Sequence, residues 1–168
     1  MMGRLWRLDD NIDTDVLAPG AYMKAPLDEL ASHCLSAVRP EFAKEVKSGD
    51  IIIAGHNMGI GSSREQAAEV LKYFGISAIF SPLFGGIFYR NAINMGLPAL
   101  QINDSDLNHP DLIDGAEVEF NLPNATLIFK KTGNTLMAEP LPSFLIDLIY
   151  DGGLVPHLEK KLKNRVIS

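Results

Sequence analysis

Residues 59 to 65, with the sequence Gly-Ile-Gly-Ser-Ser-Arg-Glu, bring two hydroxyl groups and a guanidinium into one short segment. The guanidinium of Arg64 is a planar fork of N–H donors that suits a carboxylate. The backbone amides after Ser62 can hold its oxygen once the hydroxyl proton is lost, an oxyanion-hole arrangement that here activates a base. The segment therefore predicts a site for an acidic small molecule beside a serine that accepts a proton.

The flanking sequence indicates how this segment is positioned. Residues 50–54 have the pattern of a buried strand. An amphipathic helix is expected after the loop, because apolar residues recur at the spacing i, i+3, i+4 and i+7: Ala67, Val70, Leu71 and Phe74. If that helix begins at the serines, its unpaired amides and its dipole favour negative charge there. Gly61, directly before Ser62, gives the loop backbone angles that are closed to other residues.

Three better known loop motifs do not match this segment. A Walker phosphate loop has a lysine directly before its serine or threonine, where this chain has Gly61. The dinucleotide-binding fingerprint Gly-x-Gly-x-x-Gly needs a third glycine where this chain has Arg64, and the Gly-x-Ser-x-Gly elbow of serine hydrolases is absent. The alternatives to a catalytic Ser62 are a helix N-cap, a stand-alone hydrolase whose histidine and aspartate meet only in space, and a non-enzymatic anion-binding module.

The composition of the chain is that of an ordinary globular protein. Of its 168 residues, 46% are hydrophobic and 21% are charged, which predicts one domain over residues 1–168. The formal net charge of -6 argues against a nucleic-acid partner, which needs a clustered cationic face. Since there is no apolar signal segment and no apolar stretch of about 20 residues, we expect no membrane attachment and a cytoplasmic location.

The chain offers few metal ligands. Cys34 is its only cysteine, which excludes an internal disulfide and an iron–sulfur cluster held by this chain alone, since such clusters need about four thiolates. The four histidines, His33, His56, His109 and His157, show no metal-binding spacing, and His56 stands out only because it lies in the glycine loop. We therefore predict no metal or cofactor in this chain.

Two kinds of strand pattern follow one another along the chain. Through residue 102, apolar strands alternate with helices, which predicts parallel strands joined by crossover helices. After residue 103, three short strands joined by turns predict an antiparallel meander. The expected strands are residues 3–8, 50–54, 77–81, 97–102, 117–121, 125–130 and 135–138, and the further expected helices are residues 26–33, 40–46, 84–94, 142–150 and 157–165. The predicted fold class is mixed α/β, with helices flanking a partly parallel sheet.

Several uncommon sequence blocks, in order over essentially the whole chain, resemble the small subunits of the aconitase-type dehydratases, above all 3-isopropylmalate dehydratase and homoaconitase. The blocks are residues 10–15 with Pro19, 22–24, 55–65, 88–94 with 96–98, and 151–154. The resemblance implies a swivelling β/β/α domain with a partly open, barrel-like sheet, as in the last domain of aconitase. It also implies a heterodimer or heterotetramer with a large subunit that carries a [4Fe-4S] cluster, while self-association of the isolated chain stays open.

The same resemblance assigns roles to the loop residues. Ser62 would be the base that removes a proton from the carbon beside the substrate hydroxyl, while an iron of the partner's cluster takes that hydroxyl. The amides of Ser63 and Arg64 would hold the alkoxide, and the Arg64 side chain and the Ser63 hydroxyl would bind a substrate carboxylate. Asp15 would help to order the site. Asp13 and Asp15 are explained equally well as turn residues.

Tyr22 and Lys24 lie in the block that matches the family's substrate-recognition loop. Lys24 can meet a second carboxylate, as in homoaconitate, although lysine also occurs here in isopropylmalate enzymes and a solvated loop lysine is the alternative. The chain departs from the usual pattern at Ile60, where the family has cysteine, and at Gln66, where it has histidine. We therefore expect dehydration and rehydration of a branched or extended malate, with 3-isopropylmalate first, in leucine biosynthesis, and homoaconitate or another malate analogue second.

Overall fold

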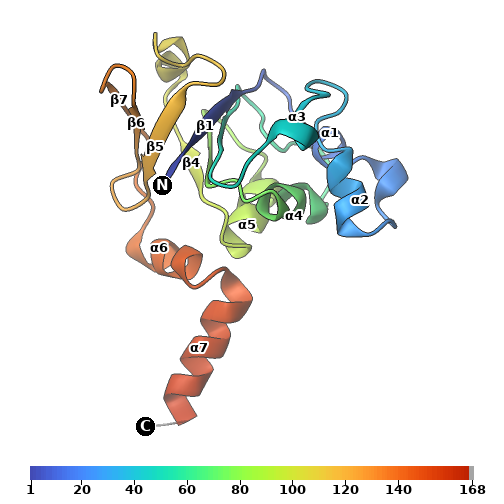
Figure 1. The fold of residues 1–168 in the computed structure, drawn as a ribbon. Coiled ribbons are helices and arrows are strands. Elements are labelled where there is room, and N and C mark those ends of the chain that lie inside the picture. Colours follow the sequence, from blue (N-terminus) through green and yellow to red (C-terminus); the bar gives the residue numbers. More distant parts are fainter. Residues whose placement is uncertain (167–168) are drawn as a thin grey trace.

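One mixed seven-stranded sheet organises the fold (Figure 1). The structure, a computed structural model, describes residues 1–166. The strands, in the order β4-β3-β2-β1-β5-β6-β7, are β1 (Met2–Arg7), β2 (Ile51–Ile53), β3 (Ala78–Ser81), β4 (Ala99–Gln101), β5 (Glu117–Asn121), β6 (Thr126–Phe129) and β7 (Thr135–Met137). β1 joins the two halves of the sheet, because its residues 5–7 pair in parallel with β2 and its residues 2–4 pair antiparallel with β5.

The parallel half of the sheet, from β1 to β4, has a buried centre. Every residue of β2 and β3 is buried, as expected for parallel strands covered by helices. α4 connects β2 to β3 and α5 connects β3 to β4, which is the predicted crossover pattern. The helices are α1 (Thr14–Leu17), α2 (Leu27–Ser32), α3 (Phe42–Glu45), α4 (Gln66–Tyr73), α5 (Gly86–Asn94), α6 (Ser143–Tyr150) and α7 (Leu154–Val166), with the 3-10 helices η1 (Gly20–Tyr22) and η2 (Asp104–Asn108).

The other half of the sheet is the predicted antiparallel meander of β5, β6 and β7. In β5, the buried Val118 and Phe120 alternate with more exposed residues, so one face of the meander covers the core. Beyond β7, the N–H of Glu139 donates to the carbonyl of Gln101 at 2.8 Å, which links the chain after one edge strand to the opposite edge strand, β4. The sheet is therefore curled into a half-barrel flanked by helices, and the predicted fold class is confirmed.

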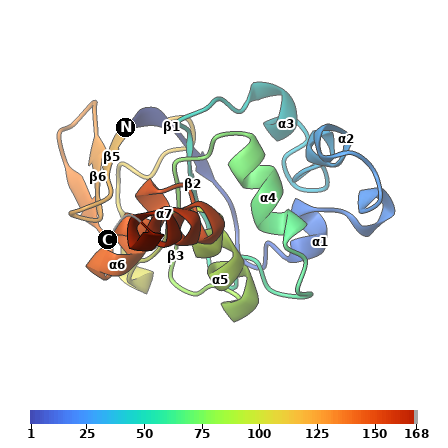
Figure 2. The ribbon, with the colours of Figure 1, turned by 90° about the horizontal axis from the view of Figure 1, so that it is seen from below.

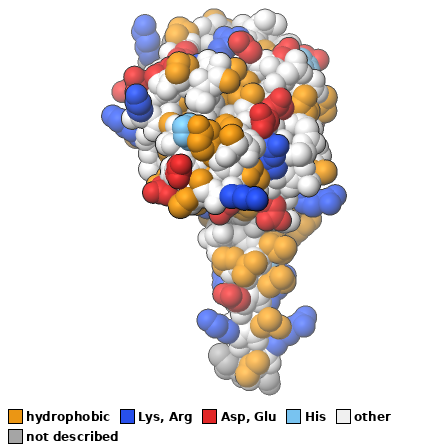
Figure 3. All heavy atoms as spheres, turned by 90° about the vertical axis from the view of Figure 1, so that its right-hand side faces the viewer, with side chains coloured by type: hydrophobic (Ala, Val, Ile, Leu, Met, Phe, Trp, Pro, Cys, Tyr) orange, Lys and Arg blue, Asp and Glu red, His pale blue; other side chains and the backbone are white. Residues whose placement is uncertain are grey.

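The helices form three groups around the sheet. Seen from below, α4 and α5 lie between the group formed by α1, α2 and α3 and the C-terminal pair of α6 and α7 (Figure 2). α7 stands out from the body of the protein, and none of its residues is buried (Figure 3). The sheet edge that bears α1 and the start of α4 is therefore separate from the place where α7 emerges.

Some helix boundaries differ from those expected from the sequence. α5 begins at Gly86, two residues after the expected start. Ile87 is 49% exposed because the buried face of this helix runs through Phe88, Ala92 and Ile93. α7 begins at residue 154, three residues before the expected start, directly after two glycines with positive φ. α4 begins only at Gln66, which affects the site described next.

Candidate functional site

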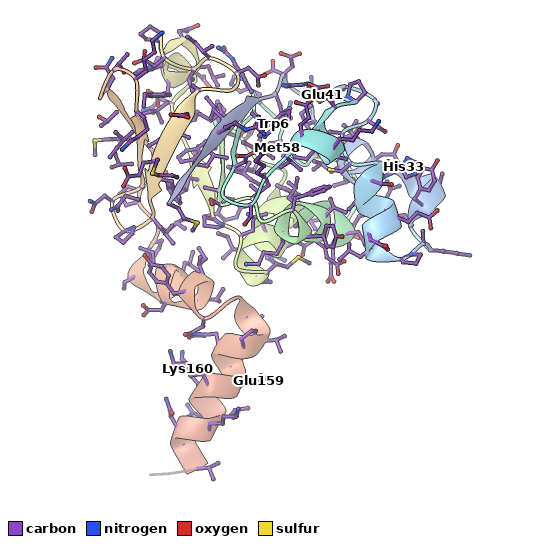
Figure 4. The ribbon with its side chains drawn as sticks, viewed as in Figure 1. Trp6, His33, Glu41, Met58, Glu159 and Lys160 are labelled. Atoms are coloured by element: carbon purple, nitrogen blue, oxygen red, sulfur yellow. The ribbon has the colours of Figure 1, made fainter. Side chains whose placement is uncertain are left out.

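The candidate site lies where two loops leave neighbouring strands. We call residues 9–15, which follow β1, the acidic loop, and residues 55–65, which follow β2, the glycine loop. Because β1 and β2 pair in parallel, both loops emerge at the carboxyl edge of the sheet, where open α/β sheets place their ligand sites. The fully buried Met58 anchors the glycine loop in the core (Figure 4).

Hydrogen bonds hold the two loops side by side. Asn57 and Asn11 both have positive φ, and the side-chain amide of Asn57 donates to the side-chain oxygen of Asn11 at 2.9 Å. Gly59 has a φ of +77°, and a Cβ at this position would overlap the ring of Phe88, so only glycine fits. The main-chain bonds between the loops run from Asn11 N to His56 O (2.8 Å), from Gly59 N to Ile12 O (2.6 Å) and from Thr14 N to Ile60 O (2.8 Å). The loops are therefore fixed before any ligand binds.

The hydroxyl of Ser62 lies next to a buried threonine. Ser62 is exposed, and its Oγ is 3.2 Å from Oγ1 of Thr14, which is only 2% exposed. The same Thr14 oxygen accepts the backbone N–H of Ser62 at 3.1 Å. Gly61 permits this close approach, because a Cβ there would lie 3.0 Å from the Thr14 oxygen and its φ is +111°. Thr14 therefore positions both the backbone and the hydroxyl of Ser62.

The turn after Ser62 leaves several backbone donors open. Ser62 is not the N-cap of α4, as the sequence pattern had allowed, because Glu65 takes that position and the helix begins at Gln66. Within residues 1–166, the backbone N–H groups of Ser63, Arg64 and Glu65 have no hydrogen-bond acceptor. Unpaired amides ahead of a helix favour an anion. These amides include the two that the sequence predicted as donors to the serine oxygen.

The side chain of Arg64 reaches across to the acidic loop. Its Nη1 donates to Oδ1 of Asp15 at 2.6 Å and to the carbonyl of Ala18 at 3.2 Å. The same Asp15 oxygen accepts the N–H of Gly20 at 2.9 Å. The hydrogen bond from Arg64, and then that from Gly20, lowers the pKa of Asp15. Among the described residues nothing pairs with Nε or Nη2 of Arg64, so this edge of the guanidinium is open to a carboxylate.

The two aspartates of the acidic loop have different contacts. The carboxylate of Asp13 accepts the N–H of Val16 at 2.8 Å and so caps α1. This is the turn-forming role that the sequence left open for Asp13. Asp15, in contrast, contacts Arg64 directly. Asp13 therefore starts the helix that carries Thr14, while Asp15 holds the guanidinium.

The block that resembles the family's substrate-recognition loop begins at Tyr22, the last residue of η1, and ends at Lys24. The ring of Tyr22 stacks on that of His33, with centroids 3.6 Å apart and planes 7° apart. His33 is the C-cap residue of α2 and is labelled in Figure 4. Lys24 is exposed, and within residues 1–166 no side chain or carbonyl pairs with its ammonium. No hydrogen bond or ion pair joins Tyr22 or Lys24 to Ser62 or Arg64, so the structure does not link these two residues to the serine site.

His56 links the site loops to η2. Its Nε2 lies 2.6 Å from Oδ1 of Asp104, and its Nδ1 lies 3.5 Å from Oδ1 of Asp10. The backbone N–H of His56 also donates to Asp10 at 2.7 Å. The hydrogen bond with Asp104 raises the pKa of His56. His56 therefore holds the start of the glycine loop, and its hydrogen bonds go to Asp10 and Asp104, not to Ser62.

Metal ligands do not gather in the described part of the chain. Residues 1–166 hold no group of three or more His, Cys, Asp or Glu side chains able to bind a metal ion. Cys34 is 1% exposed, and burial raises the pKa of its thiol, which makes it unsuited to act as a thiolate ligand or nucleophile. The residues present therefore do not fit an iron–sulfur cluster. Over the same residues, no helix has the length and apolarity needed to cross a bilayer.

Comparison with known proteins identifies the family to which this chain belongs. The profile of the aconitase C-terminal domain matches residues 32–105, which contain the glycine loop. A methanogen homoaconitase small subunit from Methanothermobacter thermautotrophicus is 45% identical over 162 residues, covering 95% of this chain and 91% of that protein. The chain belongs to the small subunits of the aconitase-type dehydratases. A 3-isopropylmalate dehydratase small subunit from Thermotoga maritima is another relative, 44% identical over 160 residues and covering 94% of each chain.

A solved member of this family has the same fold. The structure of the 3-isopropylmalate dehydratase LeuD from Methanocaldococcus jannaschii matches with a TM-score of 0.88 at 38% identity, covering 98% of this chain and 96% of that one. The similarity spans both halves of the curled sheet and is not confined to the loops. The family predicted from the sequence blocks is therefore confirmed.

Proposed function

We propose that this chain is the small subunit of a hydro-lyase that isomerises a branched or extended malate by dehydration and rehydration, with 3-isopropylmalate dehydratase as the first assignment. The arrangement around Ser62 carries the proposal, because one turn presents an exposed hydroxyl, unpaired backbone amides and the open edge of the Arg64 guanidinium. These groups suit a substrate that is a carboxylate and loses a proton from carbon. The names of the relatives support the same reaction class.

Ser62 acts as the proton acceptor in this proposal. Its oxygen can take a proton from carbon only as an alkoxide, which must be stabilised by donors already in place. The N–H groups of Ser63 and Arg64 are available, and the Thr14 hydroxyl lies within 3.2 Å. Donors that are fixed before the reaction stabilise a developing charge far better than mobile water.

Arg64 binds one carboxylate of the substrate. Since Nη1 is committed to Asp15 and to the carbonyl of Ala18, the substrate meets the edge formed by Nε and Nη2. Asp15, itself held by the N–H of Gly20, keeps the guanidinium in this orientation. The exposed hydroxyl of Ser63 adds one more donor. A malate analogue has a second carboxylate, and we propose that Lys24 or the large subunit binds it.

The departing hydroxyl of the substrate requires an acid, and residues 1–166 hold no group of side chains that could bind a metal ion for this purpose. We assign that part to the large subunit, whose existence is implied by the designation of the relatives as small subunits. A [4Fe-4S] cluster on that subunit would supply Lewis-acid chemistry. The exposure of Ser62 leaves room for a second polypeptide to close over the site.

Replacing Thr14 by valine tests how Ser62 is positioned. We expect Thr14→Val to lower kcat of the reconstituted enzyme by about 10-fold or more with little change in KM, because a reacting group that loses its alignment loses rate. Thr14→Ser keeps the hydroxyl and should retain most of the activity. Steady-state kinetics and thermal unfolding of both variants separate this effect from misfolding. Wild-type kcat in a folded Thr14→Val protein would mean that Thr14 does not position the serine.

Lys24 is proposed to set substrate choice, because it is exposed, unpaired and located in the substrate-recognition block. We expect Lys24→Ala to change the ratio of kcat/KM for 3-isopropylmalate and for homoaconitate by at least about 10-fold, the scale of one charged hydrogen bond. Lys131→Ala, in the turn between β6 and β7, is a matched control that also removes an exposed lysine. An unchanged ratio in Lys24→Ala would leave Lys24 a solvated loop residue.

Reconstitution tests the proposed function as a whole. The chain is mixed with the cluster-bearing large subunit of a 3-isopropylmalate dehydratase, and formation of the unsaturated acid is followed by its absorbance. We expect turnover only when both subunits are present. Failure with every malate analogue, together with binding of malate by the chain alone, would favour the anion-binding module. Hydrolysis of esters by the isolated chain would favour a hydrolase.

A further inference from the structure

His56 lies where three segments at the carboxyl edge of the sheet meet. The acidic loop, the glycine loop and η2 follow β1, β2 and β4, which belong to the parallel half of the sheet. The ring of His56 lies 3.5 Å from the carboxylate of Asp10, in the acidic loop, and 2.6 Å from that of Asp104, in η2. We call these three residues the His56 cluster. The cluster connects three segments that are distant in the sequence.

The backbone of His56 begins a series of hydrogen bonds that ends at Ser62. The carbonyl of His56 accepts the N–H of Asn11 at 2.8 Å, and the further main-chain bonds between the two loops lead from there to Thr14. Thr14 in turn contacts both the backbone and the hydroxyl of Ser62. The alignment of Ser62 therefore depends on how firmly the acidic loop is held at His56.

The charged groups around the ring of His56 are mostly acidic. On the elements next to it they are Arg7 at the end of β1, Asp9 and Asp10 in the acidic loop, and Asp104 and Asp106 in η2. Arg7 donates to two carbonyls of residues 107–112, and Asp106 accepts the N–H of Asn103 at 2.8 Å. The other charged residues of the two loops lie at the starts of α1 and α4 and are Asp13, Asp15, Arg64 and Glu65. The hydrogen bond with Asp104, and then the carboxylate of Asp10, raises the pKa of His56.

The contacts of the ring depend on whether it carries one proton or two. With two protons, the imidazolium donates to Asp104 and attracts the carboxylate of Asp10. With one proton, the short contact of 2.6 Å keeps that proton between Nε2 and Asp104. Nδ1 then turns a lone pair toward Asp10, and only the backbone N–H of His56 still binds that carboxylate, at 2.7 Å. Loss of a proton therefore releases the acidic loop from the ring, while η2 stays attached.

The direction of the pH effect follows from the raised pKa of His56. The attraction within the cluster is fully present below about pH 6.5, the pKa of histidine in an unfolded chain, and it is lost as the pH rises through the higher value of the folded protein. The side chains of His56, Asp10 and Asp104 are 39%, 57% and 77% exposed. Salt therefore screens the attraction, and its strength is that of an exposed ion pair.

We propose that His56 is a positioning residue for the reaction assigned to Ser62: as a cation it fixes the acidic loop to the glycine loop and η2, and without its second proton it lets the acidic loop move together with Thr14. The proposal rests on the proposed function, because the rate that it describes is that of proton removal by Ser62. A small misalignment of a reacting group lowers the rate before it weakens binding. The effect of His56 therefore falls on kcat more than on KM.

The variant His56→Gln tests this proposal, because the neutral amide resembles the neutral ring at every pH. We expect kcat of the reconstituted wild-type enzyme to exceed that of His56→Gln by about 3- to 5-fold near pH 6, the scale of an exposed ion pair, and to equal it near pH 9. Asp104→Asn should act in the same way. His157→Gln is the matched control, because it removes another histidine–carboxylate pair, with Asp151 at 2.7 Å, and it should match the wild type at both values of pH.

Hydrogen exchange of the chain alone tests the same proposal without the large subunit. The N–H of Asn11, which donates to the carbonyl of His56, reports on the contact between the two loops. We expect its protection factor to be about 3- to 5-fold higher in the wild type than in His56→Gln near pH 6, and equal near pH 9. Sodium chloride at about 1 M should remove the difference. Far-UV circular dichroism checks that each variant is folded.

The two measurements separate failure of this proposal from failure of the proposed function. Equal protection of Asn11 near pH 6 in folded wild-type and His56→Gln chains would overturn the proposal. So would an active enzyme in which the ratio of the two kcat values does not change with pH. If the wild type turns over no malate analogue, the proposed function fails, whereas the protection factors still decide whether His56 holds the loops.

Discussion

Ser62→Ala is expected to lower kcat of the reconstituted enzyme by at least about 10²-fold, the usual contribution of a positioned acid or base. The side chain is exposed, and within residues 1–166 its hydroxyl forms a hydrogen bond only with Thr14, so its removal should leave the fold intact. The KM should change little, because the Arg64 side chain and the Ser63 hydroxyl, which bind the substrate carboxylate in this proposal, remain. Steady-state kinetics with a saturating amount of the large subunit measure the effect.

Ser63→Ala provides the comparison for Ser62→Ala. Both variants remove one exposed hydroxyl from the same turn, but Ser63 is assigned to carboxylate binding, so its loss should act mainly on KM. Equal thermal unfolding midpoints for the two variants would show that neither effect reflects misfolding. If Ser63→Ala lost kcat while Ser62→Ala kept it, the base would be assigned to the wrong serine.

Arg64→Lys is expected to reduce kcat/KM by about 100-fold, mainly through KM, although the positive charge is kept. Lysine cannot present two parallel N–H groups to a carboxylate, and it cannot also hold Asp15 at 2.6 Å and the carbonyl of Ala18 at 3.2 Å. The expected loss corresponds to about 3 kcal/mol, the upper end for a hydrogen bond to a charged group. Kinetics with a dicarboxylate substrate measure it.

Asp15→Asn separates binding from orientation at Arg64. The asparagine keeps an oxygen for the N–H of Gly20 but loses the charge that pairs with Nη1, so we expect a smaller rise in KM than in Arg64→Lys. An Arg64→Lys enzyme with wild-type KM would contradict the assignment of Arg64 to the substrate carboxylate.

The framework of the site could be predicted from the sequence because its signals are local. The three isoleucines of β2 and the apolar residues of α4 have the periodicities of a buried strand and of an amphipathic helix, and both elements are present. The alternating pattern of β5 and the turns around it likewise predicted the antiparallel meander, which the structure contains. The sequence blocks gave the family, which the relatives confirm.

Other features depend on contacts between distant residues and carry no local signal. Thr14 lies 48 positions from Ser62, and a threonine between two aspartates has only the pattern of a turn. The contact could have been found only by noting that both loops follow parallel neighbouring strands. The sequence pattern allowed α4 to begin at the serines, because a serine before an apolar run resembles an N-cap, whereas the helix begins at Gln66. The direction of α7 depends on the ionic contacts of Asp151, which composition does not reveal.

The assigned roles of the site residues stay predictions, as does the single domain over residues 1–168. The contacts nonetheless sort the predicted residues into two groups. Ser62, Arg64 and Asp15 lie in two loops held together by hydrogen bonds, whereas Tyr22, at the end of η1, and Lys24 make no hydrogen bond or ion pair with them. The first group is thus expected to determine the rate and the second the choice of substrate.

The proton transfer itself can be measured in a single turnover. The reconstituted enzyme is mixed with substrate that carries hydrogen or deuterium at the carbon that loses its proton, and formation of the unsaturated acid is followed. For Ser62→Ala we predict a rate at least about 10²-fold below wild type, with a deuterium effect at least as large as that of wild type, because breaking the carbon–hydrogen bond then limits the reaction. Formation of the acid at the wild-type rate by a folded, fully assembled Ser62→Ala enzyme would contradict the assignment of Ser62 as the base.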